Sequence, residues 1–444
     1  MKLPIPAPPA STGSYEDLIE NGRFFDAILP ELPNHPSHII SRSTSPKVAK
    51  AQILEDAKNT RVIVHERVLS LIDDFLRIKT TFGSSIEQYF YVGMSRETFI
   101  ERLILKRPLS FMGSTDETLG RDGRMIEDAD KLWPLVGTEE EETPLVLEEY
   151  LSYDEMAISA LIGVSSPTYF INSGGRYNLA QPGKSGEYTE RGVYIGLTGP
   201  RFEVADQMES RLLVSDRSIC TADRGYGFHG APQTQEQALI QMWGKFYDSV
   251  HPETGHHGFP IVSSQHAPKL NSELYKKRIG VTIETFLLEA DARGVEAGTP
   301  VHVFLVGLGL GVWQIDGRQP TIFIETLFAA IESLSLSSVE VVEVSWIVES
   351  WEGKTELNLT SKDQKEIRVI FTRGEPAAKR KDSRLLVASY AWDGNAFPGN
   401  EYWRGSLSGS GDPAATCCST IAILQNGYIN PFARNVFVAR SEGY

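Results

Sequence analysis

Leu-Leu-Val-Ala-Ser at residues 385–389 leads directly into Tyr-Ala-Trp-Asp-Gly-Asn at residues 390–395 and Phe-Pro-Gly-Asn-Glu-Tyr-Trp at residues 397–403. The apolar run predicts a buried strand, with polar and aromatic residues at its carboxyl end. Ligands bind outside the carboxyl ends of the strands in an open α/β sheet. The glycines and Pro398 fix an irregular backbone there, which a shaped pocket would explain. This stretch therefore predicts an α/β fold with one wall of a ligand site around Asp393.

The sequence from residue 151 onward alternates between strand and helix patterns. Apolar runs predict strands at residues 168–171, 193–197, 301–306, 339–347 and 367–371. Capping residues and 3.6-residue periodicity predict helices after Thr234 and over residues 273–294 and 321–334. Asp412 is the expected N-cap of a further helix, with Pro413 in its first position, that runs to residue 425.

The region before residue 151 is predicted to be mainly helical. Ser95 can cap a helix that stops at Pro108. Residues 1–15 are rich in proline and small residues, and we expect a flexible N-terminus there, followed by a helical region at 16–150 and an α/β unit at 151–444. One helical face is predicted from Val64, Val68, Leu71, Ile72, Phe75 and Ile78.

The charge and cysteine content exclude several classes of protein. The 444 residues carry 43 basic and 58 acidic side chains, a formal net charge of −15, which opposes binding to a nucleic-acid polymer. Only three cysteines occur, and Cys417 and Cys418 are adjacent, so no disulfide framework is expected. Neither a secretory signal nor an apolar run of membrane-spanning length is visible. We expect a protein without a membrane partner, located in the cytoplasm or delivered into the cytosol of a host cell.

A glycine-rich turn follows the strand predicted at residues 301–306. Its glycines, Gly307, Gly309 and Gly311, leave room for backbone N–H groups to close on a diphosphate, with Val312 and Trp313 next in the chain. The spacing is neither the dinucleotide fingerprint nor a P-loop. A purely structural turn is the alternative.

Two further turns carry polar residues after predicted strands. Asn172, Gly174, Gly175 and Asn178 could meet sugar hydroxyls, or the asparagines could cap their own turn. In the other turn, Arg201 could pair with a phosphate while Glu203 or Glu209 positions a water molecule, and the alternative is a surface salt bridge.

The remaining candidates lie near the carboxyl end and in loops. Asp393 ranks above Asp412 as a site carboxylate, because an N-cap already explains Asp412. The other predicted ligand contacts of this segment are Asn395, Phe397 and Asn400. The loop histidines His251, His256, His257 and His266 lack a zinc spacing, so we expect no metal and no other cofactor.

Four motifs together resemble one family. They are Tyr-Phe-Ile-Asn172-x-Gly-Gly-Arg-x-Asn178, Gly-Leu-Thr-Gly-Pro-Arg201-Phe-Glu203, Val-Gly-Leu-Gly309-Leu-Gly-Val-Trp313 and Trp-Asp393-Gly-Asn-x-Phe-Pro-Gly-Asn400-Glu-Tyr-Trp. They resemble the MavL-like family, which includes a Legionella effector and relatives in lower eukaryotes. That family is similar to the poly-ADP-ribose glycohydrolases, so the resemblance implies a divergent macrodomain: a three-layer αβα sandwich with a mixed sheet.

The resemblance implies that the site binds ADP-ribose and removes it from a modified arginine, with ubiquitin as a candidate carrier. The turn at 307–311 would hold the diphosphate, and the turn at 172–178 would meet the distal ribose. The Gly-Gly-Gly and Gln-Glu-Glu signature of the glycohydrolases is missing, so Asp393, Glu203 and Glu209 all remain catalytic candidates. Two alternatives stay open: a reader that binds ADP-ribose without cleaving it, and a thiol hydrolase that uses Cys418 and His266.

Overall fold

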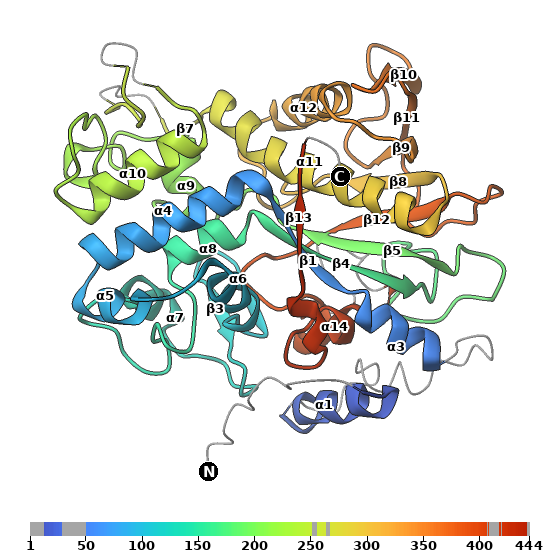
Figure 1. The fold of residues 1–444 in the computed structure, drawn as a ribbon, viewed down its shortest axis with the longest axis horizontal. Helices are drawn as coiled ribbons and strands as arrows, with labels where there is room; N and C mark the ends of the chain where they lie inside the picture. Colours follow the sequence, from blue (N-terminus) through green and yellow to red (C-terminus); the bar gives the residue numbers. More distant parts are fainter. Residues whose placement is uncertain are drawn as a thin grey trace.

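A mixed β-sheet runs through the centre of the protein (Figure 1). The structure is a computed structural model and describes residues 13–28, 50–250, 255–262, 267–405, 407, 417–418 and 420–441. Within these residues the strand order is β10-β11-β9-β8-β12-β5-β4-β1-β13. The strands are β1 (Arg61–His65), β4 (Ile162–Tyr169), β5 (Arg191–Leu197), β8 (Val301–Val306), β9 (Val339–Ser345), β10 (Glu356–Thr360), β11 (Glu366–Thr372), β12 (Leu385–Ala391) and β13 (Val436–Ala439).

Five neighbouring strands, β5, β12, β8, β9 and β11, run parallel to one another. Val387 of β12 pairs with Val193 of β5 on one side and with Val303 of β8 on the other. Strand β4 runs antiparallel to both β5 and β1. The carboxyl ends of β5, β12 and β8 therefore lie side by side at one edge of the sheet. This α/β architecture with a large mixed sheet confirms the predicted fold class.

Helices cover both faces of the sheet and make the outer two of three layers. Consecutive side chains of a strand point to opposite faces. On β4, Ser165 accepts a hydrogen bond from Arg293 of α11 (Ser272–Ala297), whereas Ser166 accepts one from Gln425, directly after α14 (Ile421–Leu424). The helix α11 and the segment around α14 therefore lie on opposite faces, as Figure 1 also shows.

The remaining elements pack around these layers. Helix α12 (Gln319–Ser333) packs beside α11, and α10 (Gln235–Phe246) packs beside α4 (Glu66–Phe82). The other helices are α1 (Tyr15–Ile28), α3 (Lys50–Lys58), α5 (Ser85–Tyr91), α6 (Arg96–Leu105), α7 (Ala129–Leu132), α8 (Tyr153–Ser159), α9 (Met208–Leu213) and α13 (Asn400–Arg404), and the short strands are β2 (Ser110–Met112), β3 (Glu117–Leu119), β6 (Val214–Ser215) and β7 (Lys269–Leu270).

The described residues before 151 are mainly helical, but they also contain the strands β1, β2 and β3. Val64 was expected on a helical face but lies in β1, which pairs with β4 and β13. The helix begins only at Glu66, where His65 accepts a hydrogen bond from the backbone N–H of Arg67 as the N-cap. Since β1 belongs to the main sheet, the region before residue 151 contributes directly to the central layer.

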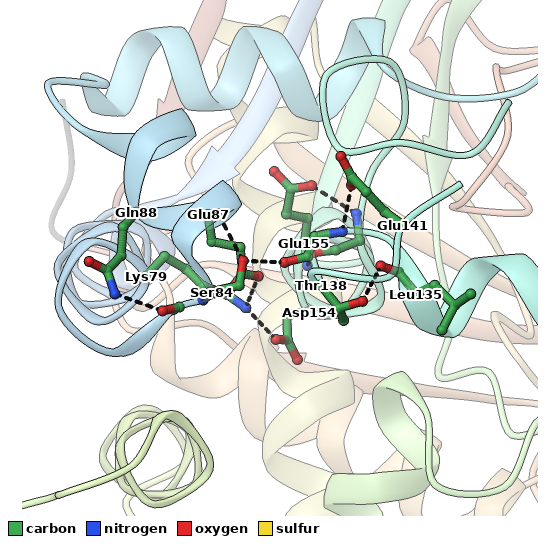
Figure 2. A network of polar contacts seen from close by, with 12 residues as sticks. Lys79, Ser84, Glu87, Gln88, Leu135, Thr138, Glu141, Asp154 and Glu155 are labelled. Carbon is green, nitrogen blue, oxygen red and sulfur yellow. Dashed lines mark hydrogen bonds and ion pairs between the residues drawn. The ribbon is translucent and has the colours of Figure 1, made fainter. Parts of the chain in front are cut away.

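A buried ion cluster joins three helices of this region. Figure 2 shows the Lys79 ammonium of α4 between the carboxylates of Glu87 and Asp154, at 2.6 and 2.7 Å. Lys79 is 1% exposed. Glu87 also completes a capping box with Ser84 at the start of α5, and Asp154 lies in the first turn of α8. This one cation therefore fixes α4 against α5 and α8.

The helix predicted from Pro413 to residue 425 is only partly confirmed. Asp412 and Pro413 lie outside the described residues. Among the described residues, α14 covers only Ile421–Leu424.

Candidate functional site

Three loops meet at the carboxyl ends of β5, β12 and β8. A Cβ atom placed on Gly199, after β5, would lie 2.3 Å from the backbone nitrogen of Gly309, after β8. A Cβ on Gly394, after β12, would lie 2.4 Å from the hydroxyl of Thr198. Glycine therefore allows both close contacts: Gly199 lies against the backbone of the β8 loop, and Gly394 lies against the Thr198 side chain. Three of the four motifs that were singled out in the sequence come together here.

The strands β8 and β12 separate just before these loops begin. Their pairing ends at Phe304 and Ala388. Beyond it, the Ser389 hydroxyl accepts a hydrogen bond from the Val306 N–H at 3.1 Å and donates one to the Phe304 carbonyl at 3.3 Å. A side chain thus replaces the strand ladder, and the two loops diverge from this point. Such a divergence between parallel strands is where α/β proteins bind ligands.

The glycine turn after β8 presents free backbone donors. Within the described part of the chain, Gly309, Gly311, Val312 and Trp313 donate no backbone hydrogen bond to another residue. Gly311 and Val312 are exposed, Val312 at 81%, whereas Gly309 is buried, so the later part of the turn lies at the surface. Successive free N–H groups in a turn form a concave site for an anion. The two glycines differ, since Gly309 has a φ of +74° whereas a Cβ on Gly311 would meet nothing within 4 Å.

Asp393 lies in the loop after β12 with a second carboxylate nearby. Its Oδ2 accepts a hydrogen bond from the side-chain amide of Asn400 at 2.5 Å. Burial raises the pKa of Asp393, and the negative charge of Glu203 raises it further, while the Asn400 hydrogen bond and Arg201 oppose the shift. The structure therefore brings together three predicted site residues, Asp393, Asn400 and Glu203. A carboxylate with a raised pKa is suited to accept a proton near neutral pH.

Arg201 lies between two carboxylates. Its Nε donates to Glu203 at 2.8 Å, and its Nη2 donates to Asp116 at 2.7 Å and to the Gly113 carbonyl at 2.8 Å. Arg201 is 4% exposed, so its pairing with Asp116 is buried rather than a surface salt bridge. The cation is already compensated by two carboxylates, so a phosphate could reach only its Nη1, which has no hydrogen-bond partner among the described residues.

Glu209 lies behind the loop that carries Arg201. Its carboxylate pairs with buried Arg278 at 3.1 Å and accepts a hydrogen bond from the Arg201 backbone. Arg278 also donates to the Thr198 carbonyl at 3.2 Å. Burial raises the pKa of Glu209, and Arg278 opposes that shift. Glu209 thus supports the loop from within, and it has less access to a ligand than Asp393 and Glu203.

Three buried polar atoms of the site have no hydrogen-bond partner among the described residues: Thr198 Oγ1, Arg201 Nη1 and Asn395 Oδ1. Asn395 is 5% exposed and uses only its amide nitrogen, which contacts the Met208 sulfur at 3.1 Å. Buried polar groups are normally paired, because an unpaired one costs about 1–3 kcal/mol. Their concentration on two of the three loops indicates a place where a polar ligand binds.

The turn at residues 172–178 begins at the opposite ends of the strands from the three loops, because Tyr169 at the end of β4 pairs with Arg191 at the start of β5. It folds back so that a Cβ on Gly174 or Gly175 would contact Pro376 or Glu375, after β11. Both asparagines support the turn itself, because Asn172 accepts from the Gly174 N–H and Asn178 accepts from the Ala180 N–H. This geometry favours the self-capping alternative, and the contact with a ribose stays a prediction.

The aromatic residues near Asp393 pack in the core. Phe397 is fully buried against Tyr428, at 5.7 Å between ring centroids, and has no exposed surface to offer a ligand. The exposed aromatic residue of this region is instead Trp346, directly after β9. Its ring is 65% exposed, its backbone has a φ of +62°, and its indole N–H donates to the Gly374 carbonyl at 3.1 Å. A Cβ placed on Gly307 would lie 3.2 Å from the side chain of the next residue, Ile347.

Neither Trp346 nor Asp116 was predicted as a site residue. Trp346 was included in the strand predicted at residues 339–347, and a tryptophan near the carboxyl end of that strand was the available signal. No local pattern marks Asp116, because its partners are distant in the sequence.

The histidine and cysteine candidates lie elsewhere. His256 and His257 line a cavity of about 600 Å³ between α4 and α10, together with His229 and Lys245. Among the described residues no group of His, Cys, Asp and Glu side chains could hold a metal ion. Cys418 is fully buried, and burial raises the pKa of its thiol. His251, His266 and Asp412 lie outside the described residues.

The sequence matches known proteins over most of its length. A family model described as MavL-like ADP-ribosylhydrolase matches residues 36–443. Two Drosophila melanogaster proteins are similar: ADP-ribosylarginine hydrolase CG3568 is 35% identical over 403 residues, 87% of this chain and 78% of that protein. ADP-ribosylarginine hydrolase CG2909 is 34% identical over 403 residues, 86% of this chain and 78% of that protein. In the described part of the chain, no helix combines the length and apolar character needed to cross a bilayer.

Proposed function

Because the chain belongs to the MavL-like ADP-ribosylhydrolase family, we propose that it binds ADP-ribose and hydrolyses the bond between ADP-ribose and a modified arginine of a protein. The linkage is taken from the names of the two Drosophila relatives. One observation carries the proposal: a turn with free backbone donors lies at the end of β8, and two neighbouring carboxylates, Glu203 and Asp393, lie on the loops after the adjacent strands β5 and β12. The first suits a diphosphate, and the second suits a glycosidic bond.

The ligand can be assigned to the loops by its chemistry. The diphosphate would bind the N–H groups of the turn at 307–313, with the distal ribose towards Asp393 and Asn395. The adenine would stack on Trp346, whose exposed ring follows the strand next to β8. A strained, exposed tryptophan held by its own indole N–H is typical of a ligand clamp. This arrangement supports the macrodomain that the resemblance implies.

The reaction needs a water molecule and a stabilised cation. Water attacks the anomeric carbon of the distal ribose, the bond from that carbon to the guanidine nitrogen breaks, and the guanidine leaves. Asp393 would accept the proton of the water, since its raised pKa makes it the better base. The carboxylate of Glu203 would stabilise the oxocarbenium-like transition state. Glu209 would support the loop.

The carrier protein is a separate question. Ubiquitin is the candidate that the resemblance names, and the proposal extends to it only as one arginine-modified substrate. A substrate panel should therefore contain arginine-ADP-ribosylated ubiquitin and a second protein with the same modification. Equal rates on both would indicate that the site recognises the adduct and not the carrier.

The test follows the loss of ADP-ribose by intact mass in the presence of EDTA. We expect the wild type to remove the modification, and Asp393→Asn and Glu203→Gln to lose most of that activity. Glu356→Gln, on the exposed edge strand β10, serves as the control and should match the wild type. Binding of ADP-ribose with no change of mass over hours would refute the hydrolase and support the reader alternative.

A further inference from the structure

The helical region before residue 151 reaches the site through the turn between β2 and β3. Asp116 lies in this turn, is 1% exposed and has a φ of +48°, a conformation that residues other than glycine rarely adopt. One oxygen of its carboxylate accepts from Arg201 at 2.7 Å, and the other accepts from the Tyr153 hydroxyl. A buried charge on a strained backbone is unfavourable for folding alone, so the arrangement indicates a functional requirement.

Arg201 is held from several sides by this region. Besides Asp116, the Gly113 carbonyl accepts from its Nη2 at 2.8 Å, and the Phe111 ring lies 4.8 Å from its guanidinium. Its Nε remains directed to Glu203 at 2.8 Å. A planar guanidinium fixed at one side has little freedom at the other. The position of Glu203 therefore depends on Asp116.

The same region also holds the loop that carries Asp393. The Arg107 guanidinium donates to the Gly394 carbonyl and lies 4.1 Å from the Trp392 ring. The Pro108 carbonyl accepts from the Phe397 N–H at 3.0 Å. Both carboxylate loops are thus bound to residues 107–116.

We propose that Asp116 is a positioning residue of the active site, which acts through Arg201 to hold Glu203 beside Asp393. The region at 107–116 is then a working part of the site. The inference rests on the proposed function, because it gives Glu203 and Asp393 their roles.

The proposal has an electrostatic consequence. The charged groups around Asp393 are Glu203 and Arg201, with Arg107 bound to the neighbouring carbonyl. Asp116 and Tyr153 face Arg201 from the other side, and Asp130 lies near Tyr153. Without the charge of Asp116, Arg201 would be compensated by Glu203 alone. Its positive charge would then favour the ionised form of Asp393, and the pKa of Asp393 would fall.

The test uses Asp116→Asn, which keeps the shape of the side chain and removes its charge. On arginine-ADP-ribosylated protein we expect kcat to fall about tenfold to a hundredfold, as for a displaced catalytic group. The acid limb of kcat/KM should move to lower pH, and the Kd for ADP-ribose should change little. Asp128→Asn is the control, because Asp128 also has a positive φ, of +52°, in the same region, but within the described part of the chain its carboxylate pairs only with exposed Lys131. This variant should match the wild type.

A second measurement does not depend on turnover. In ¹³C-labelled protein, the carboxyl carbon of Asp393, assigned through Asp393→Asn, should titrate at lower pH in Asp116→Asn than in the wild type. An unchanged titration together with a wild-type pH profile, accompanied only by a lower melting temperature, would overturn the proposal. If the wild type does not hydrolyse the substrate, the proposed function fails, and the titration still decides the role of Asp116.

Discussion

A valine at Gly311 should weaken ADP-ribose binding without weakening the fold. A Cβ at Gly311 meets nothing within 4 Å, so we expect the free energy of unfolding to stay within about 0.5 kcal/mol of wild type. The β-branched side chain would obstruct the neighbouring N–H groups. Each hydrogen bond to a charged oxygen is worth about 1.5–3 kcal/mol, so the loss of one weakens binding roughly tenfold to a hundredfold.

The neighbouring glycine is a poorer probe, for a reason that the sequence does not reveal. Gly309 has a φ of +74°, and a Cβ there would lie 3.1 Å from the Pro200 carbonyl. A residue with a side chain in that conformation costs about 1–3 kcal/mol. Gly309→Val should therefore lower the melting temperature as well as the affinity, and its loss of binding could not be assigned to the diphosphate.

The assay is isothermal titration with ADP-ribose, combined with urea denaturation of the same samples. Gly317→Val is the control, because Gly317 lies in the same connection and its Cβ would also meet nothing within 4 Å. The control should bind as the wild type does. Normal binding by Gly311→Val would refute the diphosphate cradle, and equal losses in both variants would show that the effect does not depend on the turn.

Four further outcomes are expected. Asp393→Asn should lower the rate of hydrolysis about a hundredfold or more. The folded-state pKa of Asp393 lies above its ordinary 3.8, so the stability that its protonation contributes is present at acid pH and lost as pH rises through that pKa. In thermal unfolding, the melting temperature of the Asn variant should therefore rise relative to that of the wild type towards neutral pH, and a relative fall would contradict the raised pKa. Trp346→Ala should weaken ADP-ribose binding by about 1–3 kcal/mol, and Trp346→Phe should weaken it by less. If the ring contacts adenine, the wild type and both variants should bind ribose 5-phosphate, which has no adenine, with equal affinity. Lys79→Met should cost about 3–5 kcal/mol of unfolding free energy in urea, because Glu87 and Asp154 lose their shared cation, while Lys131→Met on the surface should cost about 0.5 kcal/mol or less. Iodoacetamide should leave hydrolysis intact, since Cys418 is buried with a raised pKa, and rapid inactivation would favour the thiol alternative.

Local patterns predicted the elements that local interactions determine. The apolar run at 301–306 is β8 (Val301–Val306), and the helix expected at 273–294 is α11 (Ser272–Ala297). The strand β1 was missed because its few apolar residues merge with the periodicity of the helix that follows. Its stability as a strand comes from β4 and β13, which lie about a hundred residues or more away in the sequence.

The candidate site was predictable in its loops but not in its support. Asp393, Glu203 and the glycine turn each follow an apolar strand, and this position can be recognised in the sequence. Arg107 and Asp116 act through contacts with residues 287 and 85 positions away, which no local pattern encodes. The sequence also does not reveal which aromatic residues are buried. Phe397 and Trp346 both follow a strand, yet Phe397 is fully buried and Trp346 is 65% exposed.

The place of β12 in the sheet has a consequence for synthesis of the protein. This strand lies between β5 and β8, but it follows both in the chain. Until residues 385–391 leave the ribosome, those two strands have no partner on their facing sides, and their open edges can pair with other chains. The strand that fills this gap is followed directly by Asp393. A nascent chain therefore joins the two halves of its central sheet and acquires a candidate catalytic carboxylate in the same late step.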